Sequence, residues 1–348
     1  MIRLLIALAV GTITSLILTR VLIHLLRKLK IGQPILEDGP ERHILKSGTP
    51  TMGGIAIVAG GAMGYVFSHN FNGIYTTSGL LIMGAIILAA AVGFLDDHLK
   101  VSRERNAGLN RRAKLIGLLV VAGAFVGGVV LWGDPYTTIS FIRHDSIGWD
   151  IGTLGWVGWG VLLIVASGNA VNLTDGLDGL TAGISSFSFG AYVLICFWMF
   201  RNQGIYDVPH ALDMAVIAAA FAGGCIGFLW WNAHPAQIFM GDTGSLALGT
   251  GLACIALLSN THLLLPIIGG LYVMETLSVM LQISVFKVSK MFTGTGYRLF
   301  KMAPIHHHFE LRGWEETWVI VRFWIMGILV TAVALGLFYA DYIEVEGL

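Results

Sequence analysis

The sequence predicts an all-α integral membrane protein with about ten transmembrane helices. Of its 348 residues, 55% are hydrophobic and only 12% are charged, whereas about a quarter of the residues in a soluble domain are charged. Apolar runs of roughly 20 residues, the length that crosses a bilayer, recur along the whole chain. The 45 glycines suit close helix packing in lipid. These observations exclude a soluble globular protein.

The apolar runs place the helices in chain order, and connections rich in basic residues follow the first, third and ninth. The expected helices cover residues 2–26, 53–69, 77–95, 114–133, 152–171, 183–200, 213–231, 245–260, 263–288 and 318–340. No internal repeat or low-complexity tract divides the chain. Residues 1–348 are therefore expected to form a single polytopic transmembrane domain, and a transporter built from inverted repeats is disfavoured.

Lysine and arginine gather on one side of the predicted membrane. The connections after the first, third and ninth helices contain 16 basic residues, whereas the opposite side has only Arg3, Arg143 and Arg201. Positive residues are retained on the cytoplasmic side. Both termini are therefore expected in the periplasm, with five connections in the cytoplasm.

Two adjacent acids, Asp96 and Asp97, end the third apolar run, and Lys100 follows one helical turn later. Acids at a helix C-terminus oppose the helix dipole, which favours a functional role over a merely solvated helix end. Paired carboxylates at a membrane surface suit a divalent cation or a general base.

The segment NAVNLTDGLDGL has a carboxamide or carboxylate at every third position, namely Asn169, Asn172, Asp175 and Asp178. This spacing is expected to place them along one side of a helix end or tight loop. There they could bind a metal or accept hydrogen bonds from sugar and base groups. A polar helix cap is the alternative.

The segment WNAHPAQIFMGDTGSLALG leads into the eighth predicted helix. Asp242 is expected in a turn just before that helix, where it could serve as the N-cap. Capping does not explain the preceding polar residues such as Asn232, or Phe239, an aromatic side chain that could stack on a base.

Two further polar segments flank predicted helices. MAPIHHHFELRGW contains His306, His307 and His308. Because consecutive residues cannot face one point in a helix, phosphate binding or substrate positioning is favoured over zinc binding, with a pH-sensing loop as the alternative. LKSGTPTMGG offers Lys46 and Thr51 before the second helix, in a pattern only loosely like a phosphate nest.

Five segments, LKSGTPTMGG, FLDDHLK, NAVNLTDGLDGL, FMGDTGSLALG and PIHHHFELRGW, resemble the signature segments of the phospho-N-acetylmuramoyl-pentapeptide-transferase family, in the expected order. The histidine segment separates this family from the wider polyprenyl-phosphate N-acetylhexosamine-1-phosphate transferase superfamily. The resemblance implies a Mg²⁺-dependent, commonly dimeric enzyme of the bacterial cytoplasmic (inner) membrane, with its active site at the cytoplasmic face. Such an enzyme transfers phospho-N-acetylmuramoyl-pentapeptide from UDP-N-acetylmuramoyl-pentapeptide to undecaprenyl phosphate, giving lipid I and UMP for peptidoglycan synthesis.

By motif position, the resemblance also implies roles for single residues. The catalytic positions match Asp96, Asp97, Lys100, Asp242, His306, His307 and His308. The substrate-binding positions match Lys46, Thr51, Asn172, Asp175, Asp178, Asn232 and Phe239. Asp242 and Asn172 match the metal-binding positions. Glu275, in the middle of the ninth apolar run, matches none of these roles.

The expected mechanism is direct attack of the lipid phosphate on the donor, with Asp96 or Asp97 removing a proton. Attack by an aspartate to form an aspartyl-phosphate is the alternative. A transferase using UDP-N-acetylglucosamine is the nearest rival function. A cation-coupled transporter is the rival from another class, but it should place its polar residues near the bilayer midplane. Nucleic acid has no evident place among the partners.

Overall fold

Helices make up nearly the whole of the computed structural model, which describes residues 1–29, 48–71, 73, 75–102 and 108–347. The helices are α1 (Ile2–Lys28), α2 (Gly54–His69), α3 (Thr77–Ser102), α4 (Arg111–Trp132), α5 (Gly152–Thr174), α6 (Leu180–Arg201), α7 (Gln203–Tyr206), α8 (Ala211–Asn232), α9 (Gly241–Leu258), α10 (Leu265–Ile268), α11 (Gly270–Thr293), α12 (Ile305–Glu310) and α13 (Glu316–Glu346).

Over the described residues, nine helices are long and apolar enough to cross a membrane: α1, α3, α4, α5, α6, α8, α9, α11 and α13. All ten predicted runs are helical, nine of them as single helices and the ninth as two, so the prediction of a multi-pass membrane protein is confirmed. The remaining helix of the roughly ten expected spans, α2, is apolar but has only 16 residues. At about 1.5 Å per residue, it is shorter than a bilayer core of about 30 Å.

The ninth predicted run, 263–288, is divided in the structure. The short helix α10 has a proline in its first turn, and α11 begins only at Gly270. Gly269 and Gly270 are poor helix formers. The pair therefore separates two helices where hydropathy alone predicted one.

A small antiparallel ribbon joins α4 to α5 and was not predicted. It consists of β1 (Thr138–Ile139) and β2 (Trp149–Asp150), with Thr138 paired to Asp150 and Ile139 to Trp149. Strands of two residues are too short to give a periodic signal. The expectation of a purely α-helical chain is therefore corrected at this loop.

The core of the bundle is built on α8 and α9. Nearly every residue of α9 and most residues of α8 are buried. Helix α9 packs against α3 and α5, and α8 packs against α1 and α6. Small residues allow this close approach: a Cβ added at Gly223 of α8 would lie 2.2 Å from the carbonyl oxygen of Leu8 in α1.

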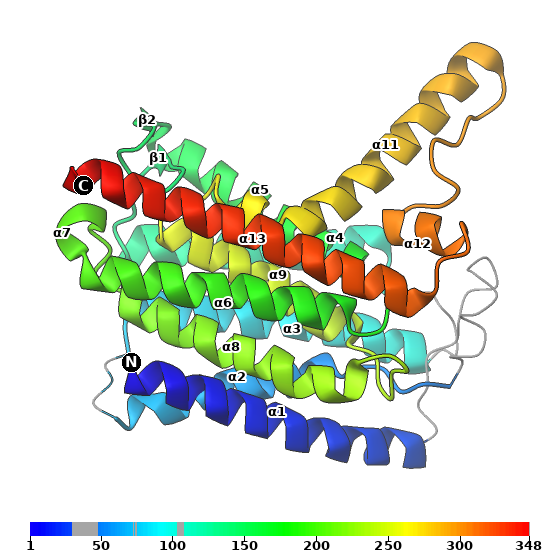
Figure 1. Ribbon diagram of the computed structural model, residues 1–348, viewed down its shortest axis with the longest axis horizontal. Helices are drawn as coiled ribbons and strands as arrows, with labels where there is room; N and C mark the ends of the chain where they lie inside the picture. Colours follow the sequence, from blue (N-terminus) through cyan, green and yellow to red (C-terminus); the bar gives the residue numbers. More distant parts are fainter. Residues whose placement is uncertain (30–47, 72, 74, 103–107, 348) are drawn as a thin grey trace.

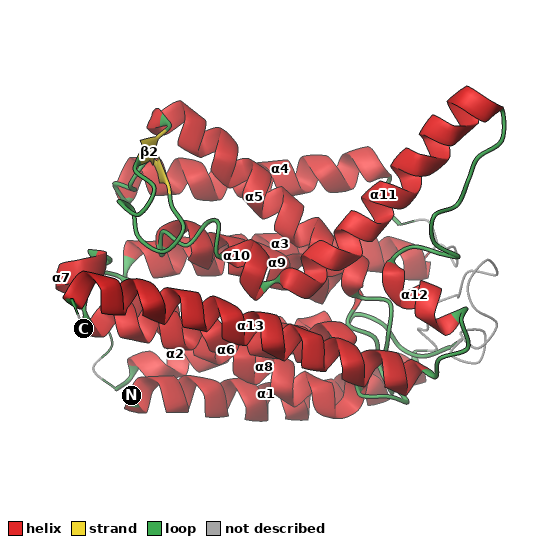
Figure 2. Cartoon of the chain, turned by 45° about the horizontal axis from the view of Figure 1, so that its top comes forward, coloured by secondary structure: helices red, strands yellow, loops and turns green. Residues whose placement is uncertain are grey.

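The two ends of the bundle differ. Figure 1 shows the N- and C-termini at one end, with α12 and the C-terminal end of α11 at the other. Figure 2 shows α11 leaning away from the remaining helices. Its outer half accordingly exposes large apolar side chains such as Met291 and Phe292.

Candidate active site

Three carboxylates from two helices meet at one place. Asp96 and Asp97 lie near the C-terminal end of α3, and Asp242 lies in the first turn of α9. All three are buried, and each offers an oxygen within 4.8 Å of the others. Because α3 and α9 pack together, the fold joins acids that are about 145 residues apart in the sequence.

Asp97 holds the start of α9. Its Oδ1 accepts the backbone N–H of Asp242 at 3.0 Å, and its Oδ2 accepts the backbone N–H of Thr243 at 2.9 Å and the Thr243 hydroxyl at 2.6 Å. These N–H groups have no partner within the helix, and the carboxylate also complements the helix dipole. The N-cap position itself is Met240, which makes no side-chain cap. The prediction that Asp242 caps its own helix is therefore wrong, since Asp97 of α3 does so.

Gly241 permits the close approach of these elements. Its φ of +73° is rarely adopted by other residues. A Cβ at this position would lie 2.5 Å from Asp97 Oδ2 and 3.0 Å from the Thr51 hydroxyl. Thr51, predicted to bind substrate, is thus buried next to the acids. Lys46, from the same predicted segment, lies outside the described residues.

Two ammonium groups lie against the acids. Lys100 Nζ is 2.6 Å from Asp96 Oδ2 and 3.1 Å from Asp242 Oδ2. Lys114 Nζ is 2.6 Å from the same Asp242 oxygen and 3.0 Å from Asn172 Oδ1. Lys114 was not among the predicted site residues. A lysine at the head of the apolar α4 was the available signal.

Asn172 completes this group from the end of α5. Its Nδ2 donates to Asp242 Oδ1 at 2.6 Å and to the Ser245 hydroxyl at 2.8 Å. Asn169, one turn earlier, instead donates to the Val165 carbonyl of its own helix at 2.8 Å. The four residues spaced by three therefore do not act as one row.

The donor set fits a hard divalent cation, which prefers oxygen ligands. Both oxygens of Asp97 already accept hydrogen bonds from the start of α9. The oxygens best placed to serve as ligands are therefore those of Asp96, Asp242 and the Asn172 side-chain carbonyl. Lys100 and Lys114 neutralise these oxygens in the structure. A cation that binds Asp242 Oδ2 must displace at least one of the two ammonium groups.

Asp175, in the loop between α5 and α6, is a carboxyl whose protonated form is favoured by its surroundings. Its carboxyl lies deep among protein atoms, although part of its surface stays accessible. Burial, and then the nearby charges of Asp242 and Asp97, raise its pKa to about 8. A neutral carboxylic acid can donate a hydrogen bond as well as accept one.

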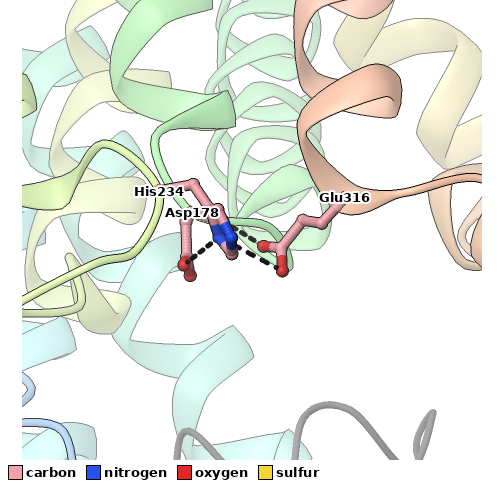
Figure 3. Close-up of side chains that lie close together, drawn as sticks. All are labelled: Asp178, His234 and Glu316. Atoms are coloured by element: carbon pink, nitrogen blue, oxygen red, sulfur yellow. Dashed lines mark hydrogen bonds and ion pairs between the residues drawn. The ribbon is translucent and has the colours of Figure 1, made fainter.

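Asp178 belongs to a second group, drawn in Figure 3, in which the His234 ring lies between Asp178 and Glu316. His234 Nδ1 is 2.9 Å from Asp178 Oδ2 and 3.5 Å from Glu316 Oε2. The backbone N–H of Asp178 donates to Glu316 Oε1 at 3.0 Å. This group ties the start of α13 to the loops after α5 and α8. The sequence analysis assigned no role to Glu316.

Asn232 and Phe239 shape the loop between α8 and α9. Both ends of the buried Asn232 amide bind backbone: its Oδ1 accepts from Gly179 at 3.0 Å, and its Nδ2 donates to Ile238 at 2.9 Å. The half-buried Phe239 bonds through its backbone to Pro50 and Gly53, each at 2.8 Å. The predicted segments around Thr51 and Asp242 are thereby joined.

The three consecutive histidines point to three different partners, because successive residues of a helix such as α12 diverge. His306 is fully buried, with Nδ1 3.1 Å from Glu275 Oε1 of α11. His307 Nδ1 lies 2.7 Å from Glu310 Oε2. His308 Nδ1 accepts the Lys301 N–H at 3.0 Å. Desolvation, then the charges of Arg312 and Lys301, lower the pKa of His308.

The structure is that of a multi-pass helical membrane protein with buried acids, lysines and amides gathered at one place, and a family model identifies its class as a transferase. Residues 79–260 match the model described as glycosyl transferase family 4. Residues 46–58 match signature 1 of the phospho-N-acetylmuramoyl-pentapeptide-transferases.

Relatives that match almost the whole length of the chain identify the family within this class. The phospho-N-acetylmuramoyl-pentapeptide-transferase of Frankia alni is 48% identical over 357 residues, which cover 98% of each chain. The enzyme of the same name from Rhodococcus opacus is 46% identical over 363 residues, with 99% of each chain covered. The chain belongs to the phospho-N-acetylmuramoyl-pentapeptide-transferase family.

Proposed function

We propose that this protein transfers phospho-N-acetylmuramoyl-pentapeptide from its UDP-linked donor to undecaprenyl phosphate, giving lipid I and UMP. The observation that supports this most directly is the contact of Asp96, Asp242, Lys100 and Lys114 at the end of the bundle. Phosphoryl transfer requires positioning and charge neutralisation more than covalent chemistry. Acids for a cation and ammonium groups for phosphate supply both.

Mg²⁺ is the proposed cofactor, with Asp242 and Asp96 as its carboxylate ligands and Asn172 as a further oxygen ligand. When bound, Mg²⁺ neutralises charge on the reacting phosphates. Asp97 is assigned to hold Asp242 in place, because its two oxygens already accept three donors from α9. Lys100 and Lys114 are free to turn toward phosphate oxygens once a cation takes their place beside Asp242.

The donor nucleotide is proposed to bind over the loops after α5 and α8. Asp178 lies here, Phe239 offers an aromatic face for the base, and Lys46 and Thr51 belong to the adjoining segment. Asn232 is assigned to bracing this pocket, since its amide already binds the backbone at Gly179 and Ile238. Asp175, whose pKa is raised to about 8 by burial, is proposed to donate a hydrogen bond to the donor.

The lipid chain of the acceptor is proposed to lie in an apolar groove between α5 and α11. Its lining includes Leu163, Ala170, Val171, Leu252, Tyr272 and Leu277. Val171 directly precedes Asn172, whose amide contacts Asp242. A polyprenyl chain in this groove would therefore present its phosphate to the acidic group.

The arrangement favours direct attack by the lipid phosphate over a covalent aspartyl intermediate. Asp242 is paired with two ammonium groups and a carboxamide, which makes its carboxylate a weak nucleophile. A phosphate monoester has a second pKa of about 6 and is largely dianionic near neutral pH. Proton removal by Asp96 would therefore contribute modestly.

The remaining parts of the proposal concern the assembly. Residues 1–348 form one transferase domain of the bacterial cytoplasmic membrane, with both termini periplasmic, the active site cytoplasmic, and the protein a homodimer. The excess of basic residues in three connections supports this orientation. Single cysteines introduced beside Arg27 and beside Asp341 test this orientation. Their accessibility to a membrane-impermeant thiol reagent is measured in spheroplasts.

The test of function is UMP release by the purified protein with undecaprenyl phosphate and Mg²⁺. Two donors are compared, UDP-N-acetylmuramoyl-pentapeptide and UDP-N-acetylglucosamine, for wild type and Asp242→Ala, with EDTA as the metal control. We expect turnover with the first donor only, lost on Asp242→Ala or EDTA. Turnover with the second donor alone would overturn the substrate assignment, and turnover in EDTA would overturn the metal assignment.

A further inference from the structure

Glu275 is an acid in an otherwise apolar part of α11. The residue is fully buried, and its neighbours in the helix include Val273, Met274 and Leu277. An ionisable group within a membrane-spanning helix costs several kcal/mol unless it is paired or faces a cavity. Such a residue calls for a specific partner.

The partner is His306, 31 positions along the chain on α12. Its Nδ1 lies 3.1 Å from Glu275 Oε1, and both side chains have no exposed surface. Among the described residues, Glu275 Oε1 and Oε2 and His306 Nδ1 and Nε2 have no hydrogen-bond partner, so the contact between the two side chains is an approach at ion-pair distance. Each side chain is thus the polar group that the structure sets against the other in this buried position.

The other edge of the His306 ring lies against the loop between α5 and α6. A Cβ added at Gly176 would be 2.4 Å from His306 Nε2. Gly176 directly follows Asp175 and lies two residues before Asp178. The imidazole is thus enclosed between the Glu275 carboxylate and the backbone of the loop that presents both acids.

We propose that Glu275 is a positioning residue for the transfer reaction, acting through His306. The carboxylate fixes the ring with a proton on Nδ1, and the ring supports the backbone at Gly176, which keeps the loop of Asp175 and Asp178 in its donor-binding shape. This inference rests on the proposed function, because the loop matters through the donor that it binds. Glu275 itself touches no substrate.

The test combines steady-state kinetics with a spectroscopic measurement that needs no activity. Glu275→Gln, His306→Gln and the double variant are compared by kcat and by KM for donor and acceptor. Ser278→Ala is the matched control, since Ser278 is also buried, lies one turn along α11, and donates its hydroxyl to the Glu275 carbonyl oxygen. In parallel, ¹⁵N spectra of histidine-labelled protein report the tautomer of His306, assigned from its loss in His306→Gln.

We expect Glu275→Gln to lower kcat/KM for the donor by about 10- to 100-fold, with KM for the lipid acceptor unchanged. The double variant should be no worse than the poorer single variant, and Glu275→Gln should shift the His306 signal away from the Nδ1-protonated form. Losses that multiply, or an unchanged His306 signal, would overturn the proposal. If Glu275→Gln fails to fold, Gly176→Ala serves instead, because its methyl group displaces the His306 ring from the other side. This variant should show the same loss of kcat/KM for the donor. Wild-type kinetics of Gly176→Ala would contradict the proposal.

Failure of the proposed function would look different. Wild type would then give no UMP from the muramoyl-pentapeptide donor, while the His306 spectra of wild type and Glu275→Gln would still reveal whether the carboxylate sets the tautomer.

Discussion

Replacing Asp97 by asparagine should weaken the fold as well as the reaction. The carboxylate accepts three hydrogen bonds from Asp242 and Thr243 at the start of α9. Asparagine keeps one acceptor oxygen and sets an NH₂ group against a buried donor. Losing one charge-assisted hydrogen bond and leaving one buried N–H without a partner together cost about 3 to 5 kcal/mol. This is a large share of the free energy of unfolding of a typical protein.

The assay is thermal unfolding in detergent, followed by tryptophan fluorescence, alongside UMP release. Asp96→Asn is the matched control, because Asp96 is the adjacent buried acid and, among the residues that the structure describes, accepts one backbone N–H, that of Leu109 at 2.7 Å. We expect both variants to lose transfer and Asp97→Asn to show the clearly larger drop in Tm. An inactive Asp97→Asn that unfolds at the wild-type temperature would refute the reasoning and assign Asp97 to the chemistry itself.

Three further predictions concern single residues. Gly241→Ala should lower both Tm and activity, because an alanine at this positive φ costs about 1 to 2 kcal/mol and its Cβ would meet buried oxygens. The control is Gly84→Ala, which has open space around its Cβ and should leave both quantities unchanged. Burial raises the pKa of Asp175 to about 8, so the folded protein holds this proton more tightly than the unfolded chain, and stability falls as pH rises from about 4 to about 8. The difference in Tm between Asp175→Asn and wild type, measured in EDTA, should therefore shift in favour of the variant over this pH range. Tm curves of the two proteins that run parallel against pH would contradict the raised pKa. Lys114→Met removes the closer ammonium from Asp242 and should reduce UMP release about 10- to 100-fold, with an unchanged rate as the contrary result.

The spanning helices could be predicted from the sequence because their signal is local. Apolar runs of sufficient length located every long helix, and polar residues after them pointed to Asp96, Asp97 and Asp242. The helix starts were less certain: α9 begins at Gly241, not at 245, because the bonds that stabilise its first turn come from Asp97 on another helix.

The pairings within the site could not be predicted, because each depends on packing between distant segments. Nothing in the sequence around Glu275 indicates His306, since the two lie on different helices and meet only when α11 and α12 fold together. The sequence likewise did not predict that Asp178 and Asn172 belong to different groups of side chains. Regular spacing placed them in one row, whereas Asn172 stays on α5 and contacts Asp242, and the turn after α5 carries Asp178 to His234.

The contact of Asp97 with the start of α9 makes the active site sensitive to the interior of the bundle. Helix α9 has almost no exposed residue, and at Gly249 even a methyl group would lie 2.4 Å from the Ser167 carbonyl oxygen. A bulky residue introduced there has no room sideways, so the helix must move, and Asp242 moves with it. Variants at Gly249, about two helical turns from Asp242, can thus inactivate the enzyme without altering any group that binds substrate.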